Sequence, residues 1–271
     1  MERVTARGLS SNDAVKTAKI LNWVLQSSNW QDVLQALRSG TEVPAIHLKN
    51  GIRIFHSADD DIGYSFFEIF GLQPYTGSGF YQPRQADTVV DIGANIGVFA
   101  LHLAGLAPGI EVHCFEPAAR ARGRLLRNLA ENQLAGKIHV YPFGVWSAPG
   151  PQRLMNYGFT GHGSVFHRDK DARSSEAIEC VDLNRVLELV PAARVDLLKI
   201  DAEGAEVEIV QGARPELWRR IERVALEYHE DIRPGCRMRL RHLLTAAGYE
   251  VNGAPGPGGD GPYGVLLAKR R

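Results

Sequence analysis

One stretch constrains the fold more than any other, and it reads Val-Val-Asp-Ile-Gly-Ala-Asn-Ile-Gly-Val-Phe over residues 89–99. An apolar strand runs into Asp91, then into a turn of small residues, and then into an apolar helix. Gly93 and Gly97 remove Cβ atoms where the backbone has to turn sharply and lie close to a ligand. Asn95, between them, tolerates left-handed backbone angles. A strand, a glycine turn and a helix in this order predict the floor of a nucleotide-cofactor site in an open α/β sheet.

The glycine spacing argues against a dinucleotide cofactor. The nicotinamide fingerprint is G-x-G-x-x-G, but Asn95 and Val98 occupy its second and third glycine positions here. The glycines instead follow G-x-x-x-G two residues after a carboxylate, which resembles the first motif of class I S-adenosylmethionine (SAM) methyltransferases. A second apolar run over 110–116 ends in Glu116, and a carboxylate at that strand end can accept hydrogen bonds from both ribose hydroxyls of an adenosine.

Composition narrows the class of protein. The chain has 271 residues, of which 44% are hydrophobic, and this suits one α/β domain with additions. Because 31 basic and 31 acidic side chains cancel, the basic excess of a nucleic-acid-binding protein is missing. The three cysteines lie far apart, and no apolar run approaches the roughly 18 residues of a membrane span. We therefore expect a cytoplasmic protein that binds neither nucleic acid nor a membrane.

The chain divides into a regular and an irregular part. Strands and helices alternate from residue 86 onward, which predicts a doubly wound, mostly parallel, seven-stranded Rossmann-like sheet over 86–271. Residues 1–85 are expected to form an N-terminal cap of helices and a hairpin that turns at Asn50-Gly51. The alternation breaks between about 147 and 193, where two β-like runs flank a glycine-rich loop. We expect this insertion to shape the substrate pocket, with the cap closing over it.

A third motif, Val-Asp-Leu-Leu-Lys-Ile-Asp-Ala-Glu-Gly-Ala-Glu over 195–206, completes a recognisable set. With it, the chain resembles the FkbM-type SAM-dependent methyltransferases, through residues 90–97, 115–117, 198–204 and the carboxylate-rich strand 226–230. The resemblance covers roughly residues 85–230. It implies a class I methyltransferase fold, SAM as cofactor, and methylation of a hydroxyl on a small molecule such as a natural product or a sugar.

Ligands of such sheets bind outside the carboxyl ends of the strands. The aromatic turn Phe143-Gly144 follows the third strand and could sandwich adenine, although Phe143 could equally anchor the loop in the core. The expected cofactor contacts come from Asp91, Gly93, Asn95, Gly97, Glu116, Phe143, Gly144 and Asp201.

An aliphatic hydroxyl is a poor nucleophile until its proton is taken, so we expect a general base near the transferred methyl. Asp201 and Glu203 follow the fourth strand, and His229 follows the fifth. Asp201 could instead cap a helix that begins near Glu203, and Glu203 could interact with the dipole of that helix. An unperturbed histidine titrates near neutral pH, which suits a base.

The insertion offers His162 and Ser164 as substrate contacts. We assign no metal site, although Asp201, Glu203 and Glu230 carry the oxygen ligands that magnesium prefers. The alternatives are methylation of nitrogen, on a small molecule or a nucleic acid, and a non-catalytic SAM-binding module. Enzymes that methylate amino groups of nucleic acids often carry Asn/Asp-Pro-Pro-Tyr where this chain has Asp-Ala-Glu-Gly at 201–204. A homodimer is compatible with the sequence.

Overall fold

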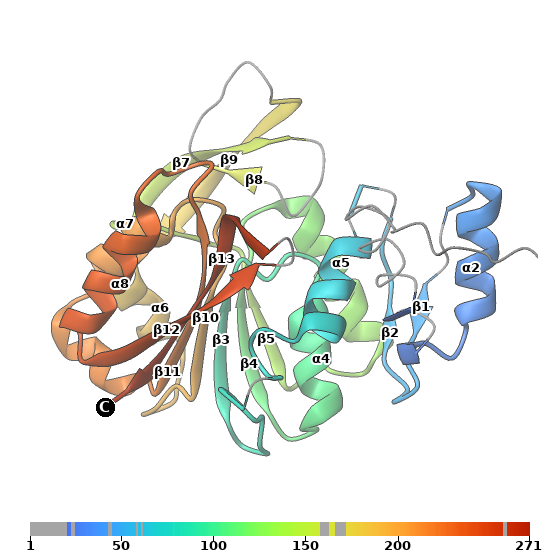
Figure 1. Cartoon of the computed structure of the whole chain (residues 1–271), viewed down its shortest axis with the longest axis horizontal. Coiled ribbons are helices and arrows are strands. Elements are labelled where there is room, and N and C mark those ends of the chain that lie inside the picture. The colour runs from blue at the N-terminus through green and yellow to red at the C-terminus, as the bar shows by residue number, and fades with distance from the viewer. Residues whose placement is uncertain are drawn as a thin grey trace, which may run out of the picture.

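A seven-stranded sheet organises the molecule (Figure 1). The computed structural model describes residues 21–22, 25–42, 45–57, 59–60, 62–77, 79–157, 163–165, 172–256 and 259–271. The strand order is β12-β13-β11-β10-β3-β4-β5; the five strands from β11 to β5 are parallel, and β13 is antiparallel to β11. The strands are β3 (Thr88–Ile92), β4 (Glu111–Phe115), β5 (Ile138–Tyr141), β10 (Leu197–Ile200), β11 (Arg223–His229), β12 (Tyr249–Gly256) and β13 (Gly259–Arg270). The predicted doubly wound, mostly parallel sheet is confirmed.

Helices cover both faces of this sheet, which explains why every residue of β3 and β10 is buried. The helices α4 (Val98–Leu106) and α5 (Ala119–Glu131) pack on one face. The helices α6 (Leu183–Leu189), α7 (Glu206–Gly212) and α8 (Cys236–Ala246) pack on the other, beside the short 3₁₀ helix η3 (Pro215–Arg220). Each face has its own hydrophobic core, so the sheet is held between two apolar layers. None of the helices in the described part of the chain is long and apolar enough to cross a membrane.

The N-terminal elements extend the α4/α5 core. They are α2 (Trp30–Ser39), the hairpin of β1 (Ile46–His47) and β2 (Arg53–Ile54), the helix α3 (Ile62–Phe66) and the π-helix η1 (Phe67–Leu72). Apolar side chains of these elements, such as Ile46, Ile54 and Phe70, share one core with α4 and α5. The predicted hairpin is confirmed, and α2, which ends at Gly40, is one of the helices expected in the cap. The first 20 residues of the predicted cap lie outside the described residues, and the domain boundary at residue 85 stays a prediction.

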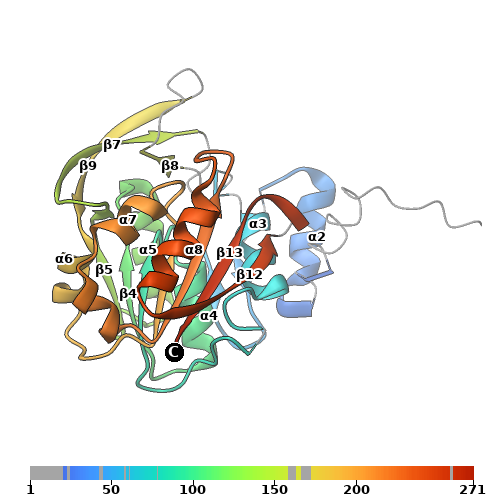
Figure 2. The same ribbon diagram turned by 60° about the vertical axis from the view of Figure 1, so that its left-hand side comes forward.

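A second, smaller sheet, most of which comes from the predicted insertion, lies above the carboxyl ends of the parallel strands (Figures 1 and 2). Its order is β6-β9-β7-β8, formed by β6 (Gly144–Val145), β7 (Gly150–Asn156), β8 (Gly163–Ser164) and β9 (Ser174–Val181). Phe143-Gly144, predicted as a turn, therefore leads directly into a short strand. The last part of the insertion was wrongly predicted as irregular, because α6 lies there as the crossover to β10. Asp182 starts α6 by accepting a hydrogen bond from the Arg185 amide at 2.8 Å.

Candidate functional site

A cavity of about 680 Å³ opens at the carboxyl ends of the parallel strands. It lies between the large sheet, the small sheet and α3/η1, and it brings together most of the residues selected from the sequence. One part of its wall, called the glycine side, consists of Gly93, Asn95, Glu116, Phe143 and Gly144. Another part, called the acidic side, consists of Glu68, Asp201, Glu203, Glu227 and His229.

The turn between β3 and α4 depends on its two glycines for different reasons. Gly93 has φ +78°, and a Cβ atom there would lie 1.7 Å from the backbone oxygen of Asp201. Gly97 has φ +88°, and its Cβ would lie 2.3 Å from Leu125 Cδ1. Gly93 thus lets the turn touch the β10–α7 loop, whereas Gly97 makes room for α5. Asn95 takes the left-handed angle that the sequence predicts, with φ +48°.

Glu116 is anchored beneath the glycine side. Its Oε2 accepts a hydrogen bond from the Asn95 amide at 2.8 Å, and its Oε1 accepts one from the Ala118 amide at 2.8 Å. Burial raises the pKa of Glu116 to about 7, against the lowering effect of these two hydrogen bonds. Each carboxylate oxygen keeps lone-pair capacity for a further donor, such as a ribose hydroxyl. The Asn95 side-chain oxygen is buried and finds no hydrogen-bond partner within the described residues.

Two residues expected at the cofactor lie behind the cavity wall instead. Asp91 is fully buried, and Lys199 Nζ lies 3.0 Å from its Oδ1 and 3.5 Å from Asp201 Oδ2. Burial raises the pKa of Asp91, and the Lys199 charge opposes that rise. Gly97 also stands outside the wall. Both residues support the turn from behind, and the sequence did not distinguish that role from a direct contact.

The loop after β10 differs from its expected form, because α7 begins at Glu206 with Ala205 as its N-cap. The alternatives in which Asp201 caps this helix and Glu203 lies in its first turn are therefore wrong. Glu203 has φ +48° and lies in the loop itself. Burial raises its pKa to about 8, while nearby His229 opposes the rise.

His229 is oriented by a buried carboxylate whose role the sequence analysis missed. Glu206 Oε1 accepts hydrogen bonds from the Ala202 and Gly204 amides at 3.1 and 3.0 Å, and His229 Nδ1 lies 3.1 Å from the same oxygen. The other ring nitrogen, Nε2, lies 3.6 Å from Glu203 Oε2. Burial lowers the pKa of His229, but Glu206 and Glu203 overcome that effect and raise it well above its usual range.

The sequence analysis gave no site role to Glu68 or to Glu227, although Glu227 belongs to the carboxylate-rich strand 226–230 named there. Glu68 comes from η1, and the Tyr75 hydroxyl lies 3.2 Å from its Oε1. Burial raises the pKa of Glu68 to about 7, and the Asp201 charge adds to the rise. Glu227 lies within β11 with only 6% of its surface exposed. Both are single carboxylates inside apolar runs, at 66–70 and 224–228, and that signal could have revealed them.

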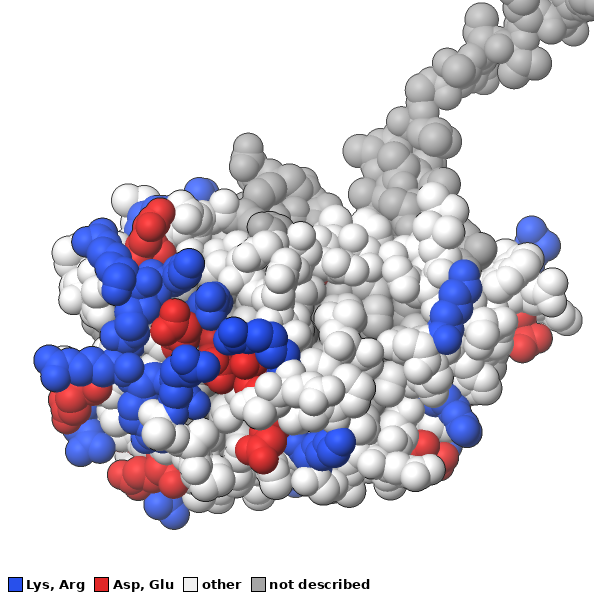
Figure 3. Space-filling view, turned by 90° about the horizontal axis from the view of Figure 1, so that it is seen from below, with Lys and Arg blue, Asp and Glu red and all other residues white. Residues whose placement is uncertain are grey.

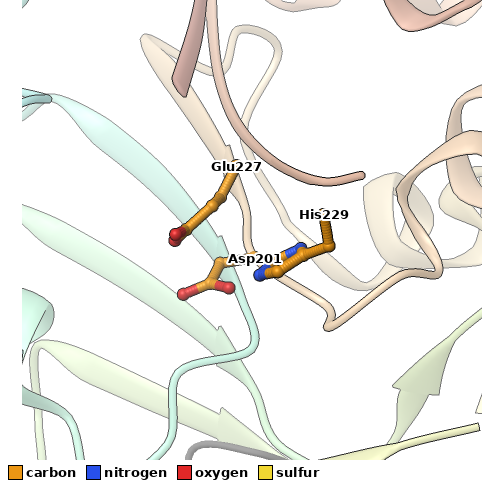
Figure 4. Close-up of side chains that lie close together, drawn as sticks. All are labelled: Asp201, Glu227 and His229. Atoms are coloured by element: carbon orange, nitrogen blue, oxygen red, sulfur yellow. The ribbon is translucent and has the colours of Figure 1, made fainter. Parts of the chain in front are cut away.

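Three side chains of the acidic side converge (Figure 4). One donor atom each from Asp201, Glu227 and His229 lies within 4.8 Å of the others. Glu230, which the sequence analysis named as a possible magnesium ligand, does not line the cavity. Its carboxylate accepts hydrogen bonds from the backbone amides of Gly235 and Arg237 at the start of α8. That option is wrong.

The predicted substrate contacts have different outcomes. Ser164 lines the cavity and is buried, and its Oγ donates a hydrogen bond to the Glu203 backbone oxygen at 2.6 Å. It therefore connects β8 to the β10–α7 loop. His162 lies outside the described residues.

Comparison with known protein families matches residues 91–251 to the methyltransferase FkbM domain. The chain belongs to the FkbM methyltransferase family. It is 30% identical over 238 residues to the 31-O-demethyl-FK506 methyltransferase FkbM of Streptomyces tacrolimicus, covering 77% of this chain and 90% of that protein. It is 26% identical over 212 residues to the methyltransferase sdnD of Sordaria araneosa, covering 68% of this chain and 81% of the relative.

A solved structure agrees on the fold. The methyltransferase FkbM of Methylobacillus flagellatus aligns with a TM-score of 0.53 at 16% identity, over 94% of this chain and 59% of that one. The predicted FkbM family and its class I methyltransferase fold are confirmed, and the protein is a methyltransferase. The family implies SAM as the methyl donor, and the glycine side suits it. The Glu116 carboxylate keeps lone pairs that can accept hydrogen bonds from the ribose hydroxyls of SAM. The buried Asn95 side-chain oxygen has no partner among the described residues and can accept a hydrogen bond from another donor of SAM, such as its amine.

Proposed function

We propose that this FkbM-family protein transfers the methyl group of SAM to a hydroxyl of a small molecule, such as a natural product or a sugar moiety. One observation carries the proposal: the glycine side and the acidic side line a single cavity and adjoin at Gly93 and Asp201. A methyl donor held on one side would thus meet a set of proton acceptors on the other. The name of the Streptomyces relative, which specifies an O-methyl position, supports the same reaction class.

The glycine side would hold the cofactor. In this assignment Glu116 accepts the ribose hydroxyls, and Phe143 and Gly144 lie along the adenine. Asp201 lies at the border of the two sides, since its backbone oxygen touches the Gly93 turn. Bound SAM supplies an electrophilic methyl group on a sulfonium.

The acidic side would prepare the acceptor. The acceptor oxygen forms a bond to the methyl carbon as the carbon–sulfur bond breaks, and S-adenosylhomocysteine leaves. The hydroxyl proton passes to a base of the acidic side, for which the candidates are Asp201, Glu203 and, once its ring has released its own proton, His229. Alignment of the two reactants in one cavity supplies much of the remaining acceleration. Ser164 contributes indirectly, because it positions the backbone of Glu203.

A nucleic-acid acceptor is disfavoured by charge. No lysine or arginine stands among the described residues that line the cavity, whereas several carboxylates do, and these would repel phosphates. Because β13 runs toward the C-terminus at the bottom of Figure 1 and is antiparallel to β11, the cavity lies at the top. Figure 3 shows the opposite end, where basic side chains gather with acidic ones among them.

Membership of an enzyme family argues against a non-catalytic module.

Incubation with methyl-labelled SAM and a panel of polyhydroxylated natural products and sugars tests the proposal. The panel includes, for each alcohol, the matching amine. We expect label in an ether product, with the alcohol preferred over its amine. Label only in amine products, or only in RNA or DNA added in parallel, would contradict it. The cytoplasmic location and a homodimer stay predictions.

A further inference from the structure

The acidic side carries more negative charge than the described protein atoms around it balance. Glu68, Asp201, Glu203 and Glu227 all face one cavity, and the lining includes no lysine or arginine among its described residues. Lys199 lies behind the wall, with its closest contact to Asp91. Buried carboxylates whose charge is not compensated destabilise a fold, so a cation is expected among them.

Glu227 shows where that cation would lie. Its side chain is more than nine-tenths buried and lines the cavity. No hydrogen bond or ion pair reaches its carboxylate from any residue that the structure describes. Figure 4 shows this carboxylate directed toward Asp201, with the His229 ring next to both. A buried acceptor aimed into a cavity without a partner points to a missing ligand.

His229 is held in the orientation that a ligand of this kind requires. Glu206 is fixed by two backbone amides and lies 3.1 Å from Nδ1 of the ring. The other nitrogen, Nε2, lies 3.6 Å from Glu203 Oε2 on the acidic side and is the ring nitrogen available to a ligand. A carboxylate behind one ring nitrogen, with the other nitrogen directed at an ion, is the usual support of a metal-binding histidine.

We propose that Asp201, Glu227 and His229 bind a divalent metal ion. An ion with bonds of about 2.0–2.3 Å spans about 4.0–4.6 Å between opposite ligands, so donor atoms that lie within 4.8 Å of one another need only small movements. Two carboxylates and one imidazole suit an ion such as Mn²⁺. The inference deepens the proposed function and rests on it, because the ion would contact the acceptor hydroxyl and make its proton easier to remove.

Electron paramagnetic resonance measures this binding without reference to activity, since bound Mn²⁺ loses the sharp signal of the free ion. Mn²⁺ alone is titrated into the metal-free protein, then into Asp201→Asn and Glu227→Gln. We expect one bound ion per chain in the wild type and more than tenfold weaker binding in both variants. The matched control is Glu111→Gln, an exposed carboxylate at the other end of the same sheet, and it should bind like the wild type. Melting temperatures establish that each variant is folded.

Three results would overturn the proposal. The first is a wild type that leaves millimolar Mn²⁺ free, and the second is unchanged Mn²⁺ binding in folded Glu227→Gln. The third is loss of Mn²⁺ binding when S-adenosylhomocysteine is added, because the cofactor's ammonium group would then occupy the cluster.

The experiments distinguish an error in the metal-site proposal from an error in the proposed function. If O-methylation persists after EDTA treatment and the protein binds no Mn²⁺, only the metal-site proposal is wrong. If Mn²⁺ binds but no ether product forms, only the proposal that the acceptor is a hydroxyl group is wrong.

Discussion

The two sides of the cavity are built in opposite ways. On the glycine side, both oxygens of Glu116 are anchored by backbone amides of nearby loops, 93–97 and 116–118. On the acidic side, Glu68, Glu203 and Glu227 come from three distant segments, and Glu227 has no hydrogen-bonding partner among the residues described. The glycine side is thus a preformed binding surface. The acidic side contains buried carboxylates whose ionisation is unfavourable unless a ligand balances their charge. Such groups lower the stability of the fold but serve the activity of a reactive site.

The largest effect is expected where the two sides touch. Gly93→Ala should cost several kcal/mol of stability or abolish SAM binding, because the new Cβ would overlap the Asp201 backbone oxygen and the residue has a positive φ. Thermal unfolding and calorimetric titration with SAM measure both. In Gly123→Ala the added Cβ of α5 meets no atom within 4 Å, so this control should be at least as stable as the wild type. A Gly93→Ala protein that behaves like its control would show that the contact between the two sides is dispensable.

Next in size are changes to the acidic side alone. Asp201→Asn, Glu203→Gln and His229→Asn each retain a similar shape, and asparagine at 229 can still donate to Glu206. Removing a general base costs about 10²–10⁴ in rate, so at least one variant should lose that much kcat at saturating SAM. We expect Asp201→Asn to be among them and to keep a near-native melting temperature. Near-native kcat in all three would mean that the acidic side does not take part in the chemistry.

A change to the glycine side should affect the cofactor rather than the acceptor. Glu116→Ala removes the predicted charge-assisted hydrogen bonds to ribose and should weaken SAM binding by about 1.5–3 kcal/mol, or roughly 10–150-fold. Calorimetry gives the SAM affinity, and the acceptor KM at saturating SAM serves as the internal control. If the acceptor KM changes while SAM affinity does not, the two sides have been assigned the wrong way round.

The smallest effect has the opposite sign. The pKa of Glu68 is about 7 in the fold against 4.5 for an unperturbed glutamate, so folding favours its protonated form. The wild type should therefore lose stability as pH rises from about 4.5 to about 7, and Glu68→Gln should gain about 1–3 kcal/mol at pH 8 but little at pH 4.5. Chemical denaturation at both pH values in EDTA measures this, with exposed Glu111→Gln as control. Destabilisation of Glu68→Gln at pH 8 would show that this charge is compensated.

The elements that the sequence predicted well are those specified by neighbouring residues. The motif at 89–99 indicated strand, turn and helix, because Gly93, Asn95 and Gly97 are needed for local backbone angles. By contrast, α6 was missed although Asp182 precedes apolar residues at helical spacing, because the irregular stretch before it masked the return of the alternation.

By itself, the sequence determined the family, the parallel sheet and the residues at its carboxyl edge, since motif spacing and apolar periodicity are properties of short segments. Only the tertiary structure decided which of these residues line the cavity and which support it from behind. It placed Asp91 behind the wall, Glu206 behind His229, and Glu68 and Glu227 within the acidic side. The reason is that the burial and charge of a carboxylate depend on segments far away in the chain, and η1 and β11 meet only after the sheet and the N-terminal elements have packed together.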